Sequence, residues 1–128
     1  MTDEVTEWTI DAGLQNNAEM VKEFYTHMVF DSGDVISGQT APTTEVLRKE
    51  AQKERLGTDI LWTATIIAGD FTQDTSIKAI WMVGKNAADE DVFLCCHKVM
   101  SVTVNSTQGI MYAFPYTVSG YLEEYDDE

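Results

Sequence analysis

The chain has 128 residues, the length of a single domain, and 44% of them are hydrophobic, so it can bury a core without metal or disulfides. It carries 22 acidic and 8 basic residues, which gives a formal net charge of −14 at pH 7. That surplus repels nucleic-acid phosphates and anionic membrane surfaces, so neither is an expected partner, whereas basic partners or cations are favoured.

A short helix and a strand are predicted at the start of the chain. After the polar residues 1–9, Asp11 can cap a helix that runs to about residue 24. Its apolar side chains recur at i, i+4 and i+7, which places three of them on one face: Leu14, Ala18 and Val21. The stretch FYTHMVF, residues 24–30, is rich in aromatic and β-branched residues and is typical of a strand. Residues 31–42, DSGDVISGQTAP, are predicted to form a loop.

The stretch TTEVLRKEAQKERL, residues 43–56, predicts a second helix. Thr43 or Thr44 can cap its start, and Glu45 precedes Lys49 by four residues, the favourable order for an ion pair. Gly57 supplies a C-terminal stop. Four of the eight basic residues lie here, on either a solvated helix face or a binding patch: Arg48, Lys49, Lys53 and Arg55.

From residue 59 onward the pattern predicts a β-meander. Strands are expected at 60–68, 76–84, 92–104 (one long bent strand or two short ones) and 110–118, between turn-forming residues. The first and the last of these each present one apolar face: Ile60, Trp62, Ala64 and Ile66, and then Ile110, Tyr112, Phe114, Tyr116 and Val118. Pro115 has no N–H for a sheet ladder, so the last strand is expected at an edge or with a bulge.

The strand at 76–84 is apolar on both faces. One face carries Ile77, Ala79, Trp81 and Val83, and the other carries Ile80 and Met82. Such a strand is central in a two-layer arrangement, or it lies at a contact between subunits. Trp81 is therefore a candidate subunit contact.

Together these elements predict an α+β fold that is mainly β. It is an antiparallel meander or sandwich with a short N-terminal helix, and the local pattern adds a second helix at 43–56. Residues 1–120 are expected to form one β-rich domain. Residues 121–128 are expected to be an acidic C-terminal tail.

No recognisable catalytic or metal-binding pattern is present, so we expect no enzyme activity, no cofactor and no metal. His97 follows Cys95 and Cys96, but zinc ligands normally come as spaced pairs, and adjacent residues on a strand point to opposite faces. Asp31, Asp34 and Glu45 could belong to a calcium loop, but Gly33 stands where the EF-hand pattern requires an oxygen ligand. Serine-nucleophile elbows and glycine-rich phosphate loops are absent.

The sequence also bears on the compartment. Its start, MTDEVTEW, lacks the hydrophobic core of a signal peptide, and no apolar run approaches the roughly 20 residues that span a bilayer. Two adjacent cysteines make no disulfide framework, which indicates a reducing compartment. We therefore expect a soluble protein made in the cytoplasm, whose acidity suits either a salt-rich host or an ordinary acidic protein.

The order of these segments resembles the N-terminal attachment (collar) domain of phage tail fibre proteins and related baseplate-attached domains. WTIDAGLQNNAEMVKEF at 8–24 is similar to that family's start, and YTHMVFDSGDV at 25–35 to its first strand and glycine turn. QTAPTTEVLRKE at 39–50 is similar to its threonine- and proline-bearing loop and basic segment. The later strands correspond to 75–100 and 109–120, with Trp81 and Met82 where the family often has Gly-Leu.

The resemblance implies a structural virion protein that attaches a fibre or spike to the tail tip or baseplate. It implies a location in the virion tail after synthesis in the host cytoplasm, and partners among other virion tail proteins. The family's shaft and tip are missing, so the fibre would be another polypeptide. The resemblance also implies that residues 43–57 are at least partly extended, which conflicts with the helix signal.

Repeated attachment sites imply several copies, so a homo-oligomer is expected. One hypothesis for its subunit contacts pairs the segment Arg48–Arg55 with the acidic tail of a neighbour: Glu123, Glu124, Asp126, Asp127 and Glu128. Such exposed pairs contribute about 0–1 kcal/mol each, so they would guide register, and deleting 121–128 should weaken assembly at low salt.

Two other functions remain open from the sequence. The first is a small acidic intracellular binding or inhibitor protein, which would be a monomer that binds a basic partner one-to-one. The second is a small hydrolase or metal-dependent enzyme, whose melting temperature a chelator would lower.

Overall fold

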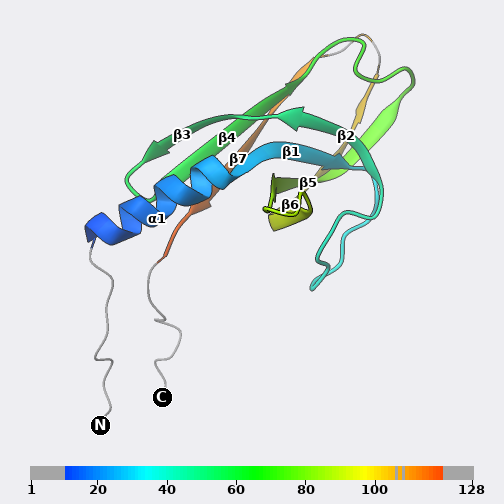
Figure 1. The fold of residues 1–128 in the computed structure, drawn as a ribbon. Coiled ribbons are helices and arrows are strands. Elements are labelled where there is room, and N and C mark those ends of the chain that lie inside the picture. Colours follow the sequence, from blue (N-terminus) through cyan, green and yellow to red (C-terminus); the bar gives the residue numbers. More distant parts are fainter. Residues whose placement is uncertain (1–10, 106, 108, 120–128) are drawn as a thin grey trace, which may run out of the picture.

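The computed structural model describes residues 11–105, 107 and 109–119, and these form one helix and seven strands (Figure 1). The fold is α+β and mainly β, as predicted. The helix, α1, is neither long nor apolar enough to cross a membrane. The elements are α1 Asp11–Phe24, β1 Tyr25–Asp31, β2 Glu45–Glu50, β3 Gln52–Leu56, β4 Asp59–Ile66, β5 Thr75–Lys85, β6 Asp91–Val104 and β7 Ile110–Thr117.

The strands form two antiparallel sheets, with orders β2-β1-β5-β6 and β3-β4-β7. Of the two predicted arrangements, the structure has the antiparallel sandwich, with both sheets packed on one core, and not a continuous meander, because β4 pairs with β7 and β5 pairs with β1. The connection at 67–74 is too long for a tight hairpin, and Phe71 within it is buried. This connection therefore carries the chain from one sheet to the other.

The predicted helix at 43–56 is wrong. This segment forms β2, which pairs with β1, and β3, which pairs with β4. Ala51 lies between them, 8% exposed, and its N–H donates to the carbonyl of Thr26 at 2.9 Å. The chain therefore runs through one sheet and continues past Ala51 into the other without a turn (Figure 1). Sheet pairing overrides the modest helix propensity of these residues.

The main core contains buried residues of both sheets and of α1. The predicted inward face of β4 is confirmed, because Ile60, Trp62, Ala64 and Ile66 are all buried. The predicted face of β7 packs on the same core through Phe114 and its alternate neighbours. As its Pro115 predicts, β7 lies at a sheet edge.

The strand β5 is central in its sheet and buried on both faces, as predicted. Ile80 and Met82 belong to the main core, while Ala79, Trp81 and Val83 form a second cluster on the outer face of the four-stranded sheet. Ile77, predicted on the Trp81 face, instead joins the main core, because the pairing with β6 shifts register between Ile77 and Ala79.

Two regions of the chain lie apart in Figure 1. The start of α1 and the C-terminal end of β7 lie together at one end of the molecule. The loop 32–44, which joins β1 to β2, lies away from that end and beside β5 and β6. This arrangement separates the exit of the chain at Ser119 from the outer face of the four-stranded sheet.

Candidate interaction surfaces

The four basic residues of segment 43–56 do not form one basic face. Two lie on β2 in one sheet and two on β3 in the other. Each forms an ion pair within the chain: Arg48 with Glu45 and Asp91, Lys49 with Asp70, Lys53 with Glu23 and Arg55 with Glu19. The tail residues Glu123, Glu124, Asp126, Asp127 and Glu128 lie outside the described residues, so their contact with this segment stays a prediction.

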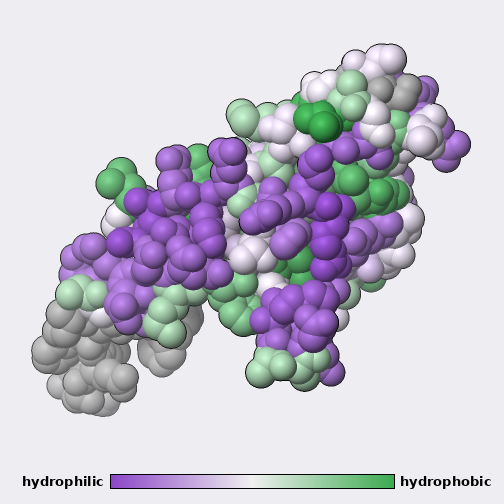
Figure 2. All heavy atoms as spheres, turned by 45° about the horizontal axis from the view of Figure 1, so that its top comes forward, coloured by the Kyte–Doolittle hydropathy of each residue, from purple (hydrophilic) through white to green (hydrophobic). Residues whose placement is uncertain are grey.

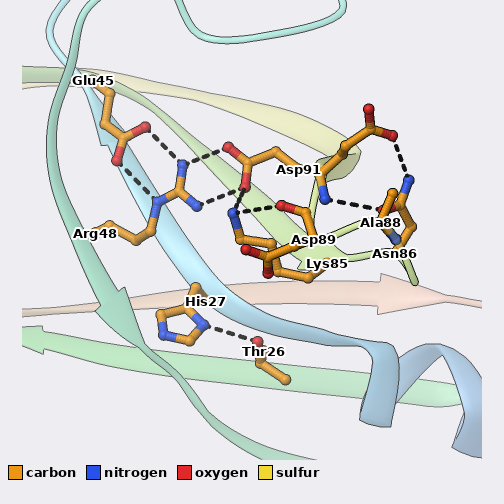
Figure 3. A network of polar contacts seen from close by, with 10 residues as sticks. Thr26, His27, Glu45, Arg48, Lys85, Asn86, Ala88, Asp89 and Asp91 are labelled. Atoms are coloured by element: carbon orange, nitrogen blue, oxygen red, sulfur yellow. Dashed lines mark hydrogen bonds and ion pairs between the residues drawn. The ribbon is translucent and has the colours of Figure 1, made fainter.

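Arg48 lies at the centre of the polar network in Figure 3. Its guanidinium donates to both carboxylate oxygens of Glu45 at 2.9 Å and to both of Asp91 at 3.0 Å. Lys85 Nζ lies 2.8 Å from Asp91 Oδ1. Arg48 and then Lys85 hold the pKa of Asp91 well below its usual value. The network ties the edge strand β2 to the start of β6.

The Asp91 network predicts a pH-dependent contribution to stability. Asp91→Asn should lower the free energy of unfolding at pH 7 by about 0.5–1 kcal/mol, since the pair is solvent-screened. Because the folded-state pKa is lowered, this stabilisation is complete above the unfolded value of 3.8 and is lost as pH falls towards the folded value. In urea unfolding, the difference between the two proteins should shrink from pH 5 to pH 3.

The control for this prediction is Asp74→Asn, at an exposed carboxylate in the 67–74 connection. It should leave stability unchanged at every pH in that range. An Asp91→Asn difference that stays constant from pH 5 to pH 3 would contradict the proposed ionic contribution.

The other two basic residues of the segment fasten α1 to β3. Lys53 Nζ lies 2.9 Å from Glu23 Oε1, and Arg55 Nε lies 2.9 Å from Glu19 Oε1. Arg55 also donates to the carbonyl of Gly57 at 2.7 Å. Hydrogen bonds from these cations lower the pKa of both glutamates, which stay exposed. The ion pairs of Lys53 and Arg55 therefore stabilise the packing of α1 on β3 within one chain.

Asp31, considered above as a calcium ligand, is fully buried and closes the loop 32–44. Its Oδ1 accepts hydrogen bonds from the N–H groups of Gly33 at 2.8 Å and Thr44 at 3.2 Å, one at each end of the loop. Its Oδ2 accepts one from Trp81 Nε1 at 3.1 Å. The carboxylate therefore joins the two ends of the loop to β5.

The three acids of the calcium hypothesis do not converge. Asp34 pairs with Lys78 at 3.1 Å, and Glu45 pairs with Arg48. Within residues 11–105, 107 and 109–119, no group of three or more His, Cys, Asp or Glu side chains is placed to hold a metal ion. The hydrogen bonds from Gly33 and Thr44 to Asp31, which close the loop 32–44, explain why a carboxylate stands at the start of this loop.

The adjacent cysteines point to opposite faces, as predicted, with Cys95 on the main core and Cys96 on the outer cluster. Burial, and then the nearby Asp31, raise the pKa of Cys96 to about 11, and burial raises that of Cys95. Both thiols are therefore protonated at neutral pH, which disfavours nucleophilic chemistry. His97, considered above as a metal ligand, is partly buried and stacks on Phe114 at 3.7 Å between ring centroids.

Trp81, the predicted subunit contact, is only 2% exposed and lies beside a pocket. Its indole packs edge-on against Phe93, with ring centroids 5.7 Å apart. The pocket, of about 610 Å³, is lined by residues 35–40 of the loop, by Trp81, and by residues 93–96 and Lys98 of β6. We call it the Lys98 pocket. Its volume is within the range of ligand-binding clefts.

Lys98 differs from the other cations of the chain. Seven of the eight basic residues form ion pairs with carboxylates of the described residues. Lys98 forms no ion pair within that part of the chain, and it is exposed at the pocket. It pairs across the sheet with Ala79, whose side chain offers no charge. The pocket thus combines an aromatic lining with an available ammonium group.

A second surface lies on the three-stranded sheet, on the side away from the core. We call it the outer sheet face, and it comprises the positions that alternate with buried ones: Gln52, Glu54, Leu56, Asp59, Leu61, Thr63, Thr65, Ile67, Met111, Ala113, Pro115 and Thr117. Half of these are apolar and none is basic. A groove of about 440 Å³ lies beside Leu56, Leu61 and Pro115.

Three side chains of the outer sheet face are exposed large hydrophobics. Leu56 is 84% exposed, Met111 66% and Ile67 55%. Figure 2 shows apolar groups gathered at the end of the molecule that carries the β6–β7 turn, whereas the end that carries α1 is mostly hydrophilic. Ile67 and Met111 lie at the β6–β7 end, because Ile66 pairs with Ile110 there.

Sequence reasoning missed both surfaces, although a local signal exists for each. Met111, Ala113 and Pro115 alternate with the aromatic positions of β7, so their exposure follows once those positions are inside. Lys98 lies two residues after Cys96 and therefore shares its face of β6. That this lysine lacks a carboxylate partner depends on residues distant in sequence.

Function must be inferred from these two surfaces and the segment order. Comparison with family models, with curated proteins and with solved structures finds no match for this chain.

Proposed function

We propose that the chain is a structural virion protein of a tailed virus, which attaches a fibre or spike to the tail tip or baseplate. The observation that carries the attachment role is the outer sheet face, where the large apolar side chains Leu56, Ile67 and Met111 are exposed and only Glu54 and Asp59 are charged. The resemblance in segment order supplies the viral context. The expected partners are other tail proteins and further copies of the chain.

The composition of the outer sheet face supports a protein contact. The cores of protein interfaces are depleted in charged residues and enriched in methionine and aromatic residues. Here two of the twelve positions are charged, both of them acidic, Glu54 and Asp59. In a chain whose net charge is −14, such a surface has little reason to face water permanently. A partner of complementary shape would cover it.

The partner is expected to cover this face and not to extend the sheet. Val118 donates its N–H to the carbonyl of Thr58 at 3.0 Å, so even-numbered residues of β7 direct their N–H groups towards β4. Odd-numbered positions then face the free edge, where Pro115 has no N–H to offer. The edge of β7 is thereby protected against pairing with another strand.

A second function is supported by the charge distribution. Because seven of the eight cations are paired within the chain, the surplus of acidic groups determines the charge that faces a partner. This favours a small acidic binding or inhibitor protein that recognises a basic surface. A monodisperse monomer that binds one basic partner would support this alternative over the attachment role.

The attachment role predicts that charge on the outer sheet face blocks assembly. The double variant Leu56→Asp, Met111→Asp should be incorporated into tail particles at least about tenfold less than wild type, since a desolvated carboxylate at an interface is costly. Both side chains are exposed, so stability should change by about 0.5 kcal/mol or less. Quantitative mass spectrometry of purified particles measures incorporation.

The matched control is Met20→Asp, at a side chain that is 62% exposed on α1. It introduces the same carboxylate on a different face and should be incorporated like wild type. Equal incorporation of all three proteins would contradict the attachment role of the outer sheet face.

A further inference from the structure

The Lys98 pocket has the chemistry of a site for a carboxylate attached to an apolar group. Trp81 and Phe93 supply an aromatic lining, and Val35 of the loop packs on the same cluster. The polar side chains that the loop contributes, Ser37, Gln39 and Thr40, carry no charge. The ammonium of Lys98 is the cation of this pocket, and no described carboxylate pairs with it.

The rim of the pocket adds apolar surface. Ile36 is 74% exposed although its neighbour Val35 packs inward. Asp31 fixes both ends of the loop that carries them, through its bonds to Gly33 and Thr44. The wall of the pocket is therefore anchored at its base, and a segment entering it would meet Ile36 on one side and β6 on the other.

The chain itself contains a segment with the required chemistry. Residues 120–128, GYLEEYDDE, follow the last described residue, Ser119. Tyr121 and Leu122 are apolar, and Glu123 and Glu124 follow them at once. Nine residues span at most about 30 Å when extended, which is enough to reach into an adjacent molecule.

We propose that the Lys98 pocket receives the C-terminal segment 120–128 of a neighbouring copy. Tyr121 and Leu122 would contact the aromatic lining, and the carboxylate of Glu123 or Glu124 would pair with Lys98. This inference rests on the proposed assembly function, in which several copies occur together. It assigns the acidic tail to Lys98 and not to the segment Arg48–Arg55, whose cations already have partners.

Because the tail and the Lys98 pocket lie on different parts of the molecule, the proposed contact between copies is head-to-tail. β7 ends at the α1 end of the molecule, whereas the loop that walls the pocket lies beside β5 and β6, away from that end (Figure 1). Each copy therefore offers its tail in one direction and its pocket in another. A heterologous contact of this kind builds a ring when the rotation closes.

The two parts of the contact have different roles. Copies with a net charge of −14 repel one another, so a single ion pair at Lys98 fixes the register of the tail without holding the copies together. The apolar contacts supply the affinity. Repetition around a ring would add avidity to a contact that already joins two isolated copies.

A complementation experiment tests the proposal. One variant ends at Ser119 and keeps its pocket, and the other, Lys98→Glu, keeps its tail. Each alone should be monomeric by sedimentation velocity at 0.15 M salt, because the first lacks the tail and the second sets a carboxylate against the carboxylates of the tail, whereas wild type self-associates. Their mixture should form one-to-one heterodimers, because the single remaining contact joins an intact tail to an intact pocket and leaves no site for a third copy.

Two controls accompany it. Lys53→Glu makes the same charge change within segment 43–56 and should self-associate like wild type. A synthetic peptide of residues 119–128 should bind the truncated protein, and Tyr121→Ser, Leu122→Ser in that peptide should weaken binding at least about tenfold. The melting temperature of Lys98→Glu should stay close to wild type, because Lys98 is exposed.

Self-association of Lys98→Glu at the wild-type level, or a mixture that stays monomeric, would overturn the proposal. A wild-type protein that is monomeric throughout, or whose tail occupies its own pocket, would overturn it as well. The attachment function fails separately, when charge on the outer sheet face leaves incorporation into particles unchanged. The two failures are therefore distinguishable.

Discussion

Asp31→Ala should lower the free energy of unfolding by about 3–5 kcal/mol, because it removes a fully buried carboxylate that accepts hydrogen bonds from three donors. These are the N–H groups of Gly33 and Thr44 and the indole Nε1 of Trp81. Loss of the closing bonds should also free the loop 32–44. Urea unfolding measures the first effect, and faster amide exchange in the loop measures the second.

Two variants sharpen this prediction. Asp31→Asn keeps one acceptor oxygen and should cost about half as much as the alanine. Asp34→Ala, three residues on, removes a carboxylate that is 89% exposed and should cost less than about 1 kcal/mol. If Asp31→Ala unfolds at the wild-type urea concentration, the carboxylate does not hold the loop in the way described.

Phe114→Ala should cost about 3–5 kcal/mol, the range for removing a large aromatic side chain from a core. Phe114 is fully buried on β7. Its ring meets Trp62 edge-on, with centroids 6.1 Å apart, and stacks on His97 of the other sheet. The side chain therefore joins the two sheets, and urea unfolding should show the full loss.

His97 provides an independent measurement of the same change. Burial lowers its pKa in the folded protein, so the folded state takes up its proton at lower pH than the unfolded chain. In Phe114→Ala the cavity admits water, and the pKa should rise towards 6.5, as followed by NMR. Met111→Ala, at an exposed position of the same strand, should change neither quantity. A His97 titration identical in all three proteins would contradict the stacking.

The strands of the second half were predictable because their signal is local. In β4 and β7, apolar and polar residues alternate with the period of a strand, and the buried set is the set that alternation predicts. Pro115 likewise indicated an edge from its own chemistry. The order of the strands was not predictable in this way, because pairing of β5 with β1 depends on contacts about 50 residues apart.

Segment 43–56 shows where local rules fail. Glu45 and Lys49 have the spacing of a helical ion pair, yet Lys49 pairs with Asp70 and Arg48 reaches Asp91. Asp70 and Asp91 come close to this segment only after the sheets form. The same basic side chains that could form ion pairs in a helix therefore form ion pairs between strands and loops in the fold. The resemblance implied an extended segment here, and the structure has two strands.

The candidate site was less predictable than the fold. Trp81 was singled out from the apolar pattern of β5, but its neighbours on the outer face come from the loop and from β6. Asp31 was noticed for its polar loop, and its hydrogen bond to Trp81 joins residues 50 positions apart. In the sequence, Lys98 does not differ from any other lysine. It is distinguished only by the fold, which pairs the other seven cations with carboxylates of the described residues.

The direct continuation of β2 into β3 at Ala51 has a mechanical consequence. Since β2 and β3 are one continuous stretch of chain shared by both sheets, neither sheet can lose this strand without straining the other. A pull applied to one sheet would be transmitted through Ala51 into the other sheet. The domain should then resist load as a single body and give way in one step.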